Sequence, residues 1–240
     1  MRQTLTFIFF VFLIFSGRSQ SSSLDSLRMV SPVGHTSAVE CASFSGNDDL
    51  VISASSDFSL ALWSRTSGKL LRKWLAHDER VYSAQFNSNS ENILSASADG
   101  TAKLWDTKSG ELIKSFVFDS RGLYSACYSA DEKTILVSFF EGFSAIIDVY
   151  SGQTIQEFRG HEDRIYSSSF SMDGTQIVTA SRDKTVKLWD VRTGRNTQTF
   201  SGHKDWVYTA LFANNNTIVS CSRDGIIMSW DIPKNTVNYS

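Results

Sequence analysis

Short runs of alternating apolar and polar residues, separated by turn residues, fill the chain from about residue 35 onward. In the clearest stretch the runs cover residues 164–170, 176–180, 185–190 and 195–200, and the turns cover residues 172–174, 182–184 and 193–194. Asp and Gly at these turns tolerate tight reversals between antiparallel strands. The pattern predicts a four-stranded antiparallel sheet, which must pack against neighbours to bury its faces.

The same pattern returns every 42 residues, a period typical of repeat architectures. One register holds His35, His77, Asp119, His161 and His203, and a second holds Val39, Val81, Leu123, Ile165 and Val207. Further registers hold Phe44, Phe86, Tyr128, Phe170 and Phe212, then Trp74, Phe116, Phe158 and Phe200, and finally Trp63, Trp105, Ile147, Trp189 and Trp230. Five coincident registers indicate five copies of one unit.

The unit resembles the WD repeat. It starts with Gly-His at Gly34-His35, Gly160-His161 and Gly202-His203, and it ends with Trp-Asp at Trp105-Asp106, Trp189-Asp190 and Trp230-Asp231. Ala76 replaces the glycine in the second copy, and Ser64 replaces the aspartate in the first. The resemblance implies an all-β fold, a β-propeller of four-stranded blades. The repeats would cover about residues 27–64, 69–106, 111–148, 153–190 and 195–231.

The sequence does not decide whether the blades form a closed ring. Residues 24–33 are typical of an outer strand, and members of the family commonly pair such a strand with the last three strands of the chain. Residues 236–240 also have the pattern of an outer strand. The alternatives are a small closed ring of five blades and an open arc of a larger propeller, and we favour the arc. An open arc would expose unpaired strands or faces.

His161, Ser181 and Asp183 suggest a hydrolase triad, but the same constellation recurs in four of the five repeats. A catalytic site is normally built once, so repetition favours a structural role. The resemblance implies that each set, with a tryptophan, forms a buried hydrogen-bonded tetrad. The four expected tetrads are His35/Ser55/Asp57/Trp63, His77/Ser97/Asp99/Trp105, His161/Ser181/Asp183/Trp189 and His203/Ser222/Asp224/Trp230.

The third repeat lacks this set, because Asp119, Phe139, Glu141 and Ile147 replace the four residues. Its alternating apolar pattern survives at Leu123, Tyr128, Ile135, Leu136 and Ile146. We expect this blade to form by packing alone and to be the softest of the five.

The resemblance also implies a partner-binding rim at one end of the channel. It is built from residues three and five positions after each histidine and from the residue before each tetrad acid. Tyr, Trp and Arg are enriched among binding hot spots. The candidate partner-binding residues, called the Tyr/Arg rim below, are Arg80, Tyr82, Tyr124, Phe140, Arg164, Tyr166, Arg182, Trp206, Tyr208 and Arg223.

These observations predict a non-catalytic scaffold that binds a protein or peptide, whose acidic or phosphorylated side chains would pair with the arginines. One alternative is a nucleic-acid-binding propeller, since arginines beside aromatic rings can hold phosphates and stack on bases. The net charge of −2 disfavours it. Another alternative is an exported binding module or enzyme. No cofactor is expected, and no Cys/His spacing suggests a metal site.

The first residues differ from the rest. Residues 1–19 combine a positive start, an apolar run at residues 5–15 and small polar residues, which is typical of a secretory signal peptide. A misplaced start codon is the alternative. The run is too short to span a bilayer, so no span is expected in the mature chain. Residues 20–26 would be a Ser-rich linker and residues 27–240 the propeller. The leader favours secretion, whereas propellers of the family that the chain resembles are mostly intracellular.

Overall fold

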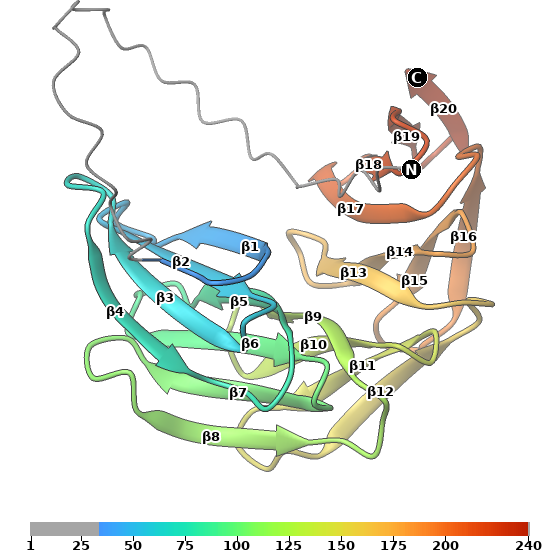
Figure 1. Cartoon of the computed structure of the whole chain (residues 1–240). Coiled ribbons are helices and arrows are strands. Elements are labelled where there is room, and N and C mark those ends of the chain that lie inside the picture. Colours follow the sequence, from blue (N-terminus) through green and yellow to red (C-terminus); the bar gives the residue numbers. More distant parts are fainter. Residues whose placement is uncertain (1–33, 240) are drawn as a thin grey trace, which may run out of the picture.

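In the computed structural model, residues 34–239 are described, and they form five antiparallel sheets of four strands each (Figure 1). Each sheet uses four strands that are consecutive in sequence. The first sheet contains β1 (Val39–Phe44), β2 (Leu50–Ser55), β3 (Ser59–Ser64) and β4 (Leu70–Leu75). The second contains β5 (Val81–Phe86), β6 (Asn92–Ser97), β7 (Thr101–Asp106) and β8 (Leu112–Val117).

The other three sheets repeat this order. The third contains β9 (Leu123–Tyr128), β10 (Thr134–Phe139), β11 (Phe143–Asp148) and β12 (Thr154–Arg159). The fourth contains β13 (Ile165–Phe170), β14 (Gln176–Ser181), β15 (Thr185–Asp190) and β16 (Asn196–Ser201). The fifth contains β17 (Val207–Asn214), β18 (Thr217–Ser222), β19 (Ile227–Asp231) and β20 (Thr236–Tyr239). The predicted fold class is confirmed, and the innermost strands start at the expected residues.

The turn between the second and third strands of each sheet has a common conformation. The residue after the acidic position has a positive φ in all five sheets: Phe58, Gly100, Gly142, Lys184 and Gly225. Three of these are glycine, which adopts this region without a Cβ penalty. Phe58 and Lys184 reach it at φ 69° and 72°. The acid that precedes each turn is thereby placed beside the start of the blade.

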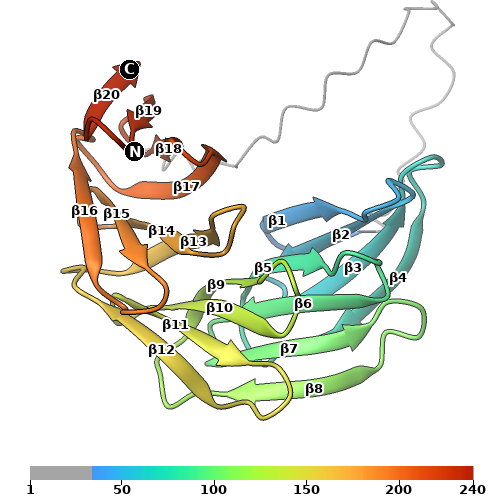
Figure 2. The ribbon, with the colours of Figure 1, turned by 180° about the vertical axis from the view of Figure 1, so that it is seen from behind.

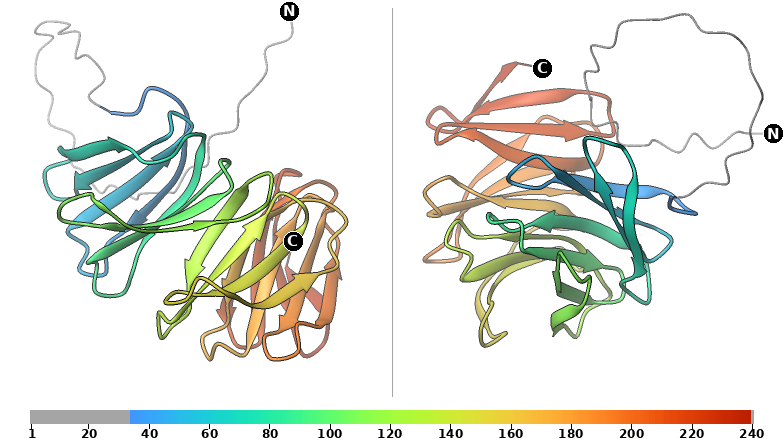
Figure 3. Two further views of the ribbon diagram at one scale, coloured as in Figure 1. Left: turned by 90° about the horizontal axis from the view of Figure 1, so that it is seen from below. Right: turned by 90° about the vertical axis from the view of Figure 1, so that its left-hand side faces the viewer.

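Apolar cores lie between consecutive sheets and not within any one sheet. At the junction of the fourth and fifth sheets, for example, Val186 and Phe200 pack with Val207, Ala210 and Trp230. The innermost strands contact one another in the order β1, β5, β9, β13 and β17. The five sheets therefore follow an arc, with the first sheet (blue) and the fifth (red) at its two ends (Figures 1, 2 and 3).

The fifth sheet takes its outer strand from β20, which pairs with β19. The C-terminal segment therefore supplies the strand for which the sequence offered two candidates. The other candidate, residues 24–33, lies outside the described residues, as do the predicted leader at residues 1–19 and the linker at residues 20–26. Within residues 34–239 no helix is long and apolar enough to cross a membrane.

Candidate functional site

Histidine, hydroxyl, aspartate and tryptophan groups form a buried network in the first, second, fourth and fifth sheets. In the fourth sheet, the His161 Nδ1 atom lies 2.6 Å from Asp183, and its Nε2 atom lies 2.7 Å from the Thr179 hydroxyl. The Trp189 indole N–H donates to the same hydroxyl at 2.8 Å. A neutral imidazole satisfies every partner here, because Nδ1–H donates to the carboxylate and Nε2 accepts from the hydroxyl.

The hydroxyl of each network is not the one that the sequence analysis named. It comes from Ser53, Ser95, Thr179 or Ser220, each of which contacts both the histidine and the tryptophan at 2.7–2.9 Å. The predicted Ser55, Ser97, Ser181 and Ser222 are therefore wrong as tetrad members. Each accepts instead from the backbone N–H of its aspartate and donates to a backbone carbonyl at the blade's start.

Position along the strand explains the difference. Ser181 pairs with Ile165 at the end of β14, next to the turn that holds Asp183. Thr179 lies two residues earlier on the same face and pairs with Lys187, closer to Trp189 on β15. The indole therefore reaches Thr179. The signal was present in the sequence as a hydroxyl residue two positions before each predicted serine.

Burial and hydrogen bonding set the protonation of these networks. Burial lowers the pKa of His77 and His161, and the nearby aspartates only partly oppose it. Burial by itself would raise the pKa of Asp99 and Asp183, but hydrogen bonds from the histidines and from Thr101 or Thr185 outweigh it and hold both pKa values well below the usual range. Neutral histidine and ionised aspartate are therefore the favoured states at neutral pH.

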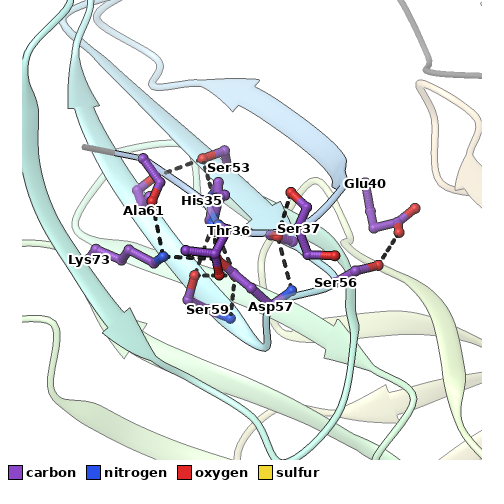
Figure 4. Close-up of polar contacts among 12 residues, drawn as sticks. His35, Thr36, Ser37, Glu40, Ser53, Ser56, Asp57, Ser59, Ala61 and Lys73 are labelled. Atoms are coloured by element: carbon purple, nitrogen blue, oxygen red, sulfur yellow. Dashed lines mark hydrogen bonds and ion pairs between the residues drawn. The ribbon is translucent and has the colours of Figure 1, made fainter. Parts of the chain in front are cut away.

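The first sheet adds a lysine to its network (Figure 4). The Lys73 ammonium donates to Asp57 at 2.8 Å and to the Gly34 carbonyl at 3.1 Å. His35 bonds Asp57 at 3.1 Å and Ser53 at 2.8 Å. Burial opposes ionisation of Asp57, but the lysine and further hydrogen bonds hold its pKa far below the usual range.

The third sheet forms without a tetrad. Val137 stands at the position of the tetrad hydroxyl, and Glu141 accepts a hydrogen bond from the Arg121 backbone N–H. Phe139 stacks on Phe143, with ring centroids 4.2 Å apart and an interplanar angle of 12°. Phe118 packs edge-on against Phe139, with centroids 5.2 Å apart. Aromatic packing therefore replaces the polar network in this blade.

The Tyr/Arg rim forms a continuous row of ring contacts across the inner ends of the sheets. Tyr82 packs on Tyr124 with centroids 4.7 Å apart, and Tyr124 packs on Tyr166 at 4.8 Å. Phe140 stacks on Tyr124 at 4.1 Å, and Tyr166 packs on Tyr208 at 5.3 Å. Burial, together with the neighbouring Tyr124, raises the pKa of Tyr82 and Tyr166, so both phenols stay neutral.

Arginines gather where this row reaches the fourth and fifth sheets. The guanidinium groups of Arg182 and Arg223 each lie 4.4 Å from the centroid of the Trp206 ring. Arg164 donates to the Tyr124 hydroxyl at 3.1 Å, and this bond raises the pKa of the arginine. Arg80, which directly precedes β5, lies near the Tyr82 phenol. The structure thus brings together the ten residues of the Tyr/Arg rim.

Two neighbours of the rim were not anticipated. Asp163 lies 3.6 Å from Arg182, and Asp205 lies 3.9 Å from Arg223. Both acids stand two residues after a tetrad histidine, and this shared position could have identified them from the sequence. Gly122 stands at an expected rim position, three residues after Asp119, and a Cβ there would lie 2.8 Å from the Ala98 carbonyl oxygen and 3.0 Å from the Phe140 ring. The missing side chain lets Phe140 approach Tyr124.

The rim changes character along the arc. Its first-sheet positions are Ala38, Glu40 and Ser56, and the Ser56 hydroxyl donates to the Glu40 carboxylate. Over the second and third sheets the rim has one arginine beside three aromatic rings, whereas over the fourth and fifth sheets it has three arginines and three aromatic rings. Among the described residues, no three His, Cys, Asp or Glu side chains gather so as to hold a metal ion.

Comparison with known proteins agrees with the repeat geometry. The family described as "WD domain, G-beta repeat" matches residues 26–64, 68–106, 152–190 and 194–231, which is more than half of the chain. The third repeat, which lacks the tetrad, is not among these matches. No match was found among the curated proteins. Domains of this family generally act as protein-interaction scaffolds and are usually non-catalytic. The chain belongs to the WD-repeat family.

Proposed function

We propose that the chain is a non-catalytic scaffold that binds a protein or peptide partner across the Tyr/Arg rim. The partner would present an acidic or phosphorylated side chain to the arginines of the fourth and fifth sheets. The observation that carries this proposal is the stack in which Arg182 and Arg223 lie against Trp206. Stacking fixes both guanidinium planes before a partner arrives, which lowers the entropy cost of binding.

The charges near the stack support an anionic ligand. Asp163 and Asp205 contact Arg182 and Arg223 at 3.6 and 3.9 Å, which are long for charge-assisted hydrogen bonds. All four side chains are at least a third exposed, so these surface pairs contribute little to stability. An incoming carboxylate or phosphate could bind both arginines at closer range. The tyrosines beside them offer rigid contact area for the rest of a peptide.

A peptide array tests the proposal. It would hold phosphorylated, acidic and neutral versions of the same peptides and be probed with the wild type and with R182A, R223A and R195A. Arg195 is an exposed arginine in the turn before β16 and serves as the matched control. We expect R182A and R223A to weaken binding of the anionic peptides about thirtyfold each, which corresponds to about 2 kcal/mol, and R195A to change nothing. Equal binding by all four proteins would contradict the proposal.

Arg164 and Tyr166 give a second test within the rim. If both contact the partner, R164A and Y166A should each reduce binding while the melting temperature stays close to that of the wild type. If Tyr166 only packs the channel mouth, Y166A should lower the melting temperature and leave binding intact. Binding of single-stranded nucleic acid with a steep dependence on salt would favour the nucleic-acid alternative instead.

A further inference from the structure

The hairpin that joins β17 to β18 differs from the corresponding hairpin in the other four sheets. In those sheets the turn is longer, and one of its side chains accepts from the backbone N–H of the residue that begins the next strand. Ser45 does so in the first sheet, at 2.9 Å from the Leu50 nitrogen. The equivalent side chains are Asn87, Ser129 and Ser171. Ala213 stands at this position in the fifth sheet and has no such group, and β17 continues to Asn214.

A run of three asparagines forms the tip of this hairpin. Asn214 pairs with Thr217, and its side-chain oxygen accepts from the Asn216 backbone N–H at 2.9 Å. Within residues 34–239 no group hydrogen-bonds the carboxamide of Asn215, which lies between them. All three asparagines are exposed. The Asn215 carboxamide is therefore accessible to other molecules.

The sequence at this tip is an acceptor for N-linked glycosylation. Asn215, Asn216 and Thr217 have the required order Asn-X-Thr, which in exported proteins marks a surface loop. Asn214 and Asn216 do not begin such a sequence, because Asn216 and Ile218 stand two places after them. The other acceptor sequence of the chain is residues 238–240, which ends outside the described residues. The hairpin tip thus presents one acceptor between two asparagines that are not acceptors.

The surroundings of the tip leave room for a bulky group. A hollow of about 510 Å³ lies between the three asparagines and the turn that joins β13 to β14. Met172 and Asp173 line its other side, and Met172 is 77% exposed. A first sugar on Asn215 would fit beside this turn without displacing any buried side chain.

The hairpin lies at the opposite ends of the strands from the Tyr/Arg rim. Trp206 directly precedes β17 and Arg223 directly follows β18, whereas Asn215 directly follows β17. β17 has eight residues, which corresponds to roughly 25 Å at the usual rise per residue. A group attached to Asn215 would therefore leave the rim open.

We propose that the chain is exported and that Asn215 carries an N-linked glycan. The sequence of residues 1–19, which is typical of a secretory signal peptide, supports export. The donor is an oligosaccharide linked to a lipid through a diphosphate. The Asn215 carboxamide nitrogen forms a bond to C1 of the first sugar, and the bond from C1 to the diphosphate oxygen breaks. The lipid diphosphate leaves with the electron pair, and the nitrogen gives up one proton to the transferase.

Secretion from cultured animal cells tests this on the full 240-residue chain with its own residues 1–19. Treatment with peptide-N-glycosidase shows the glycan as a shift in electrophoretic mobility. Mass spectrometry locates it, because the enzyme converts a glycosylated asparagine to aspartate. The variants are N215Q and T217A, which remove the acceptor sequence, and T217S, which keeps it. N214Q and N216Q are the matched controls, because each changes a neighbouring asparagine of the same turn and leaves the acceptor sequence intact.

We expect the secreted wild type, T217S, N214Q and N216Q to carry the glycan at Asn215, and N215Q and T217A to lose it. The melting temperature of N215Q should match that of the enzymatically deglycosylated wild type, which shows that the variant loses the glycan and not the fold. A wild type that stays in the cytosol without a glycan would overturn the proposal. A secreted wild type whose only glycan is on Asn238 would overturn it as well.

Discussion

A single hydroxyl holds each tetrad together, since it accepts from the tryptophan and donates to the histidine. In the fourth sheet this group is Thr179, which is fully buried together with Trp189. Removing it would leave the indole N–H and the imidazole Nε2 without partners in a site that excludes water. An unsatisfied buried polar group costs about 1–3 kcal/mol.

Replacement of Thr179 by valine tests this role at nearly constant volume. Val137 already occupies the equivalent position in the third sheet, so the side chain fits this strand environment. We expect T179V to lower the free energy of unfolding by about 1–3 kcal/mol in urea titration. W189F should also destabilise the fold, and the double variant should lose less than the sum, because both act on one network. Strict additivity would contradict the shared hydroxyl.

At this scale the sequence identified three of the four tetrad partners. Histidine, aspartate and tryptophan are rare enough that their recurrence is conspicuous. Ser and Thr occur at many positions, and Ser53 and Ser55 lie on the same face of one strand. Only the strand register shows that the indole reaches the earlier hydroxyl. Asp163 and Asp205 were missed for a similar reason, because their pairing with rim arginines depends on how far the side chains extend.

Individual blades can be held by polar networks or by aromatic packing. The third sheet buries Val137, Phe139 and Ile147 almost completely, with Phe143 and Phe118 against Phe139. The Arg159 guanidinium lies 4.0 Å from the Phe143 ring centroid and covers its outer side. The apolar pattern at Leu123, Tyr128, Ile135, Leu136 and Ile146 predicted this sheet, and the structure buries both faces of β10 and β11. The stacked rings were not predictable, because they depend on rotamers.

Phe139 is the residue on which the third blade should depend most. F139A removes a large buried ring from between two others, and substitutions of this kind cost about 3–5 kcal/mol. We expect a loss of this size in the free energy of unfolding. F139S should do no better, although it introduces the serine found at this position in the other blades, because a serine side chain does not fill the volume of the lost ring. A loss below about 1 kcal/mol in F139A would contradict the packing role.

The sequence also predicts that the third blade opens more readily than the others, which concerns local dynamics and not overall stability. Hydrogen exchange compares equivalent strands directly, with β10 and β14 as the matched pair. If polar tetrads stiffen a blade more than aromatic packing does, amides of β10 should exchange faster than those of β14. Equal or slower exchange in β10 would show that the rings compensate fully for the missing network.

At the scale of the whole arc, the sequence predicts some features and leaves others undecided. The number and order of the sheets follow from the period of the repeat. Closure does not, because residues 24–33 and 236–240 have the same outer-strand pattern. The pairing of β20 with β19 decides which segment completes the fifth sheet. The gradient from Glu40 to the arginines around Trp206 is likewise a property of the assembled arc.

Stability of the molecule should depend on pH through histidines buried in its blades. Burial lowers the pKa of His77 and His161 in the folded state, so below about pH 6.5 the unfolded chain binds protons that the folded chain does not. Stability is therefore complete above this pH and falls as pH decreases. Two protons give a slope of up to about 2.7 kcal/mol per pH unit.

The aspartates act in the same direction at lower pH. Hydrogen bonds hold the pKa of Asp99 and Asp183 below the usual value, so their contribution is present above about pH 4 and is lost as pH falls further. Urea titrations at pH 7.5, 6.0 and 5.0 isolate the histidine contribution. We expect H161Q, which retains His77, to show about half the slope of the wild type. A free energy of unfolding that stays constant from pH 7.5 to 5.0 would contradict the neutral, buried state of these histidines.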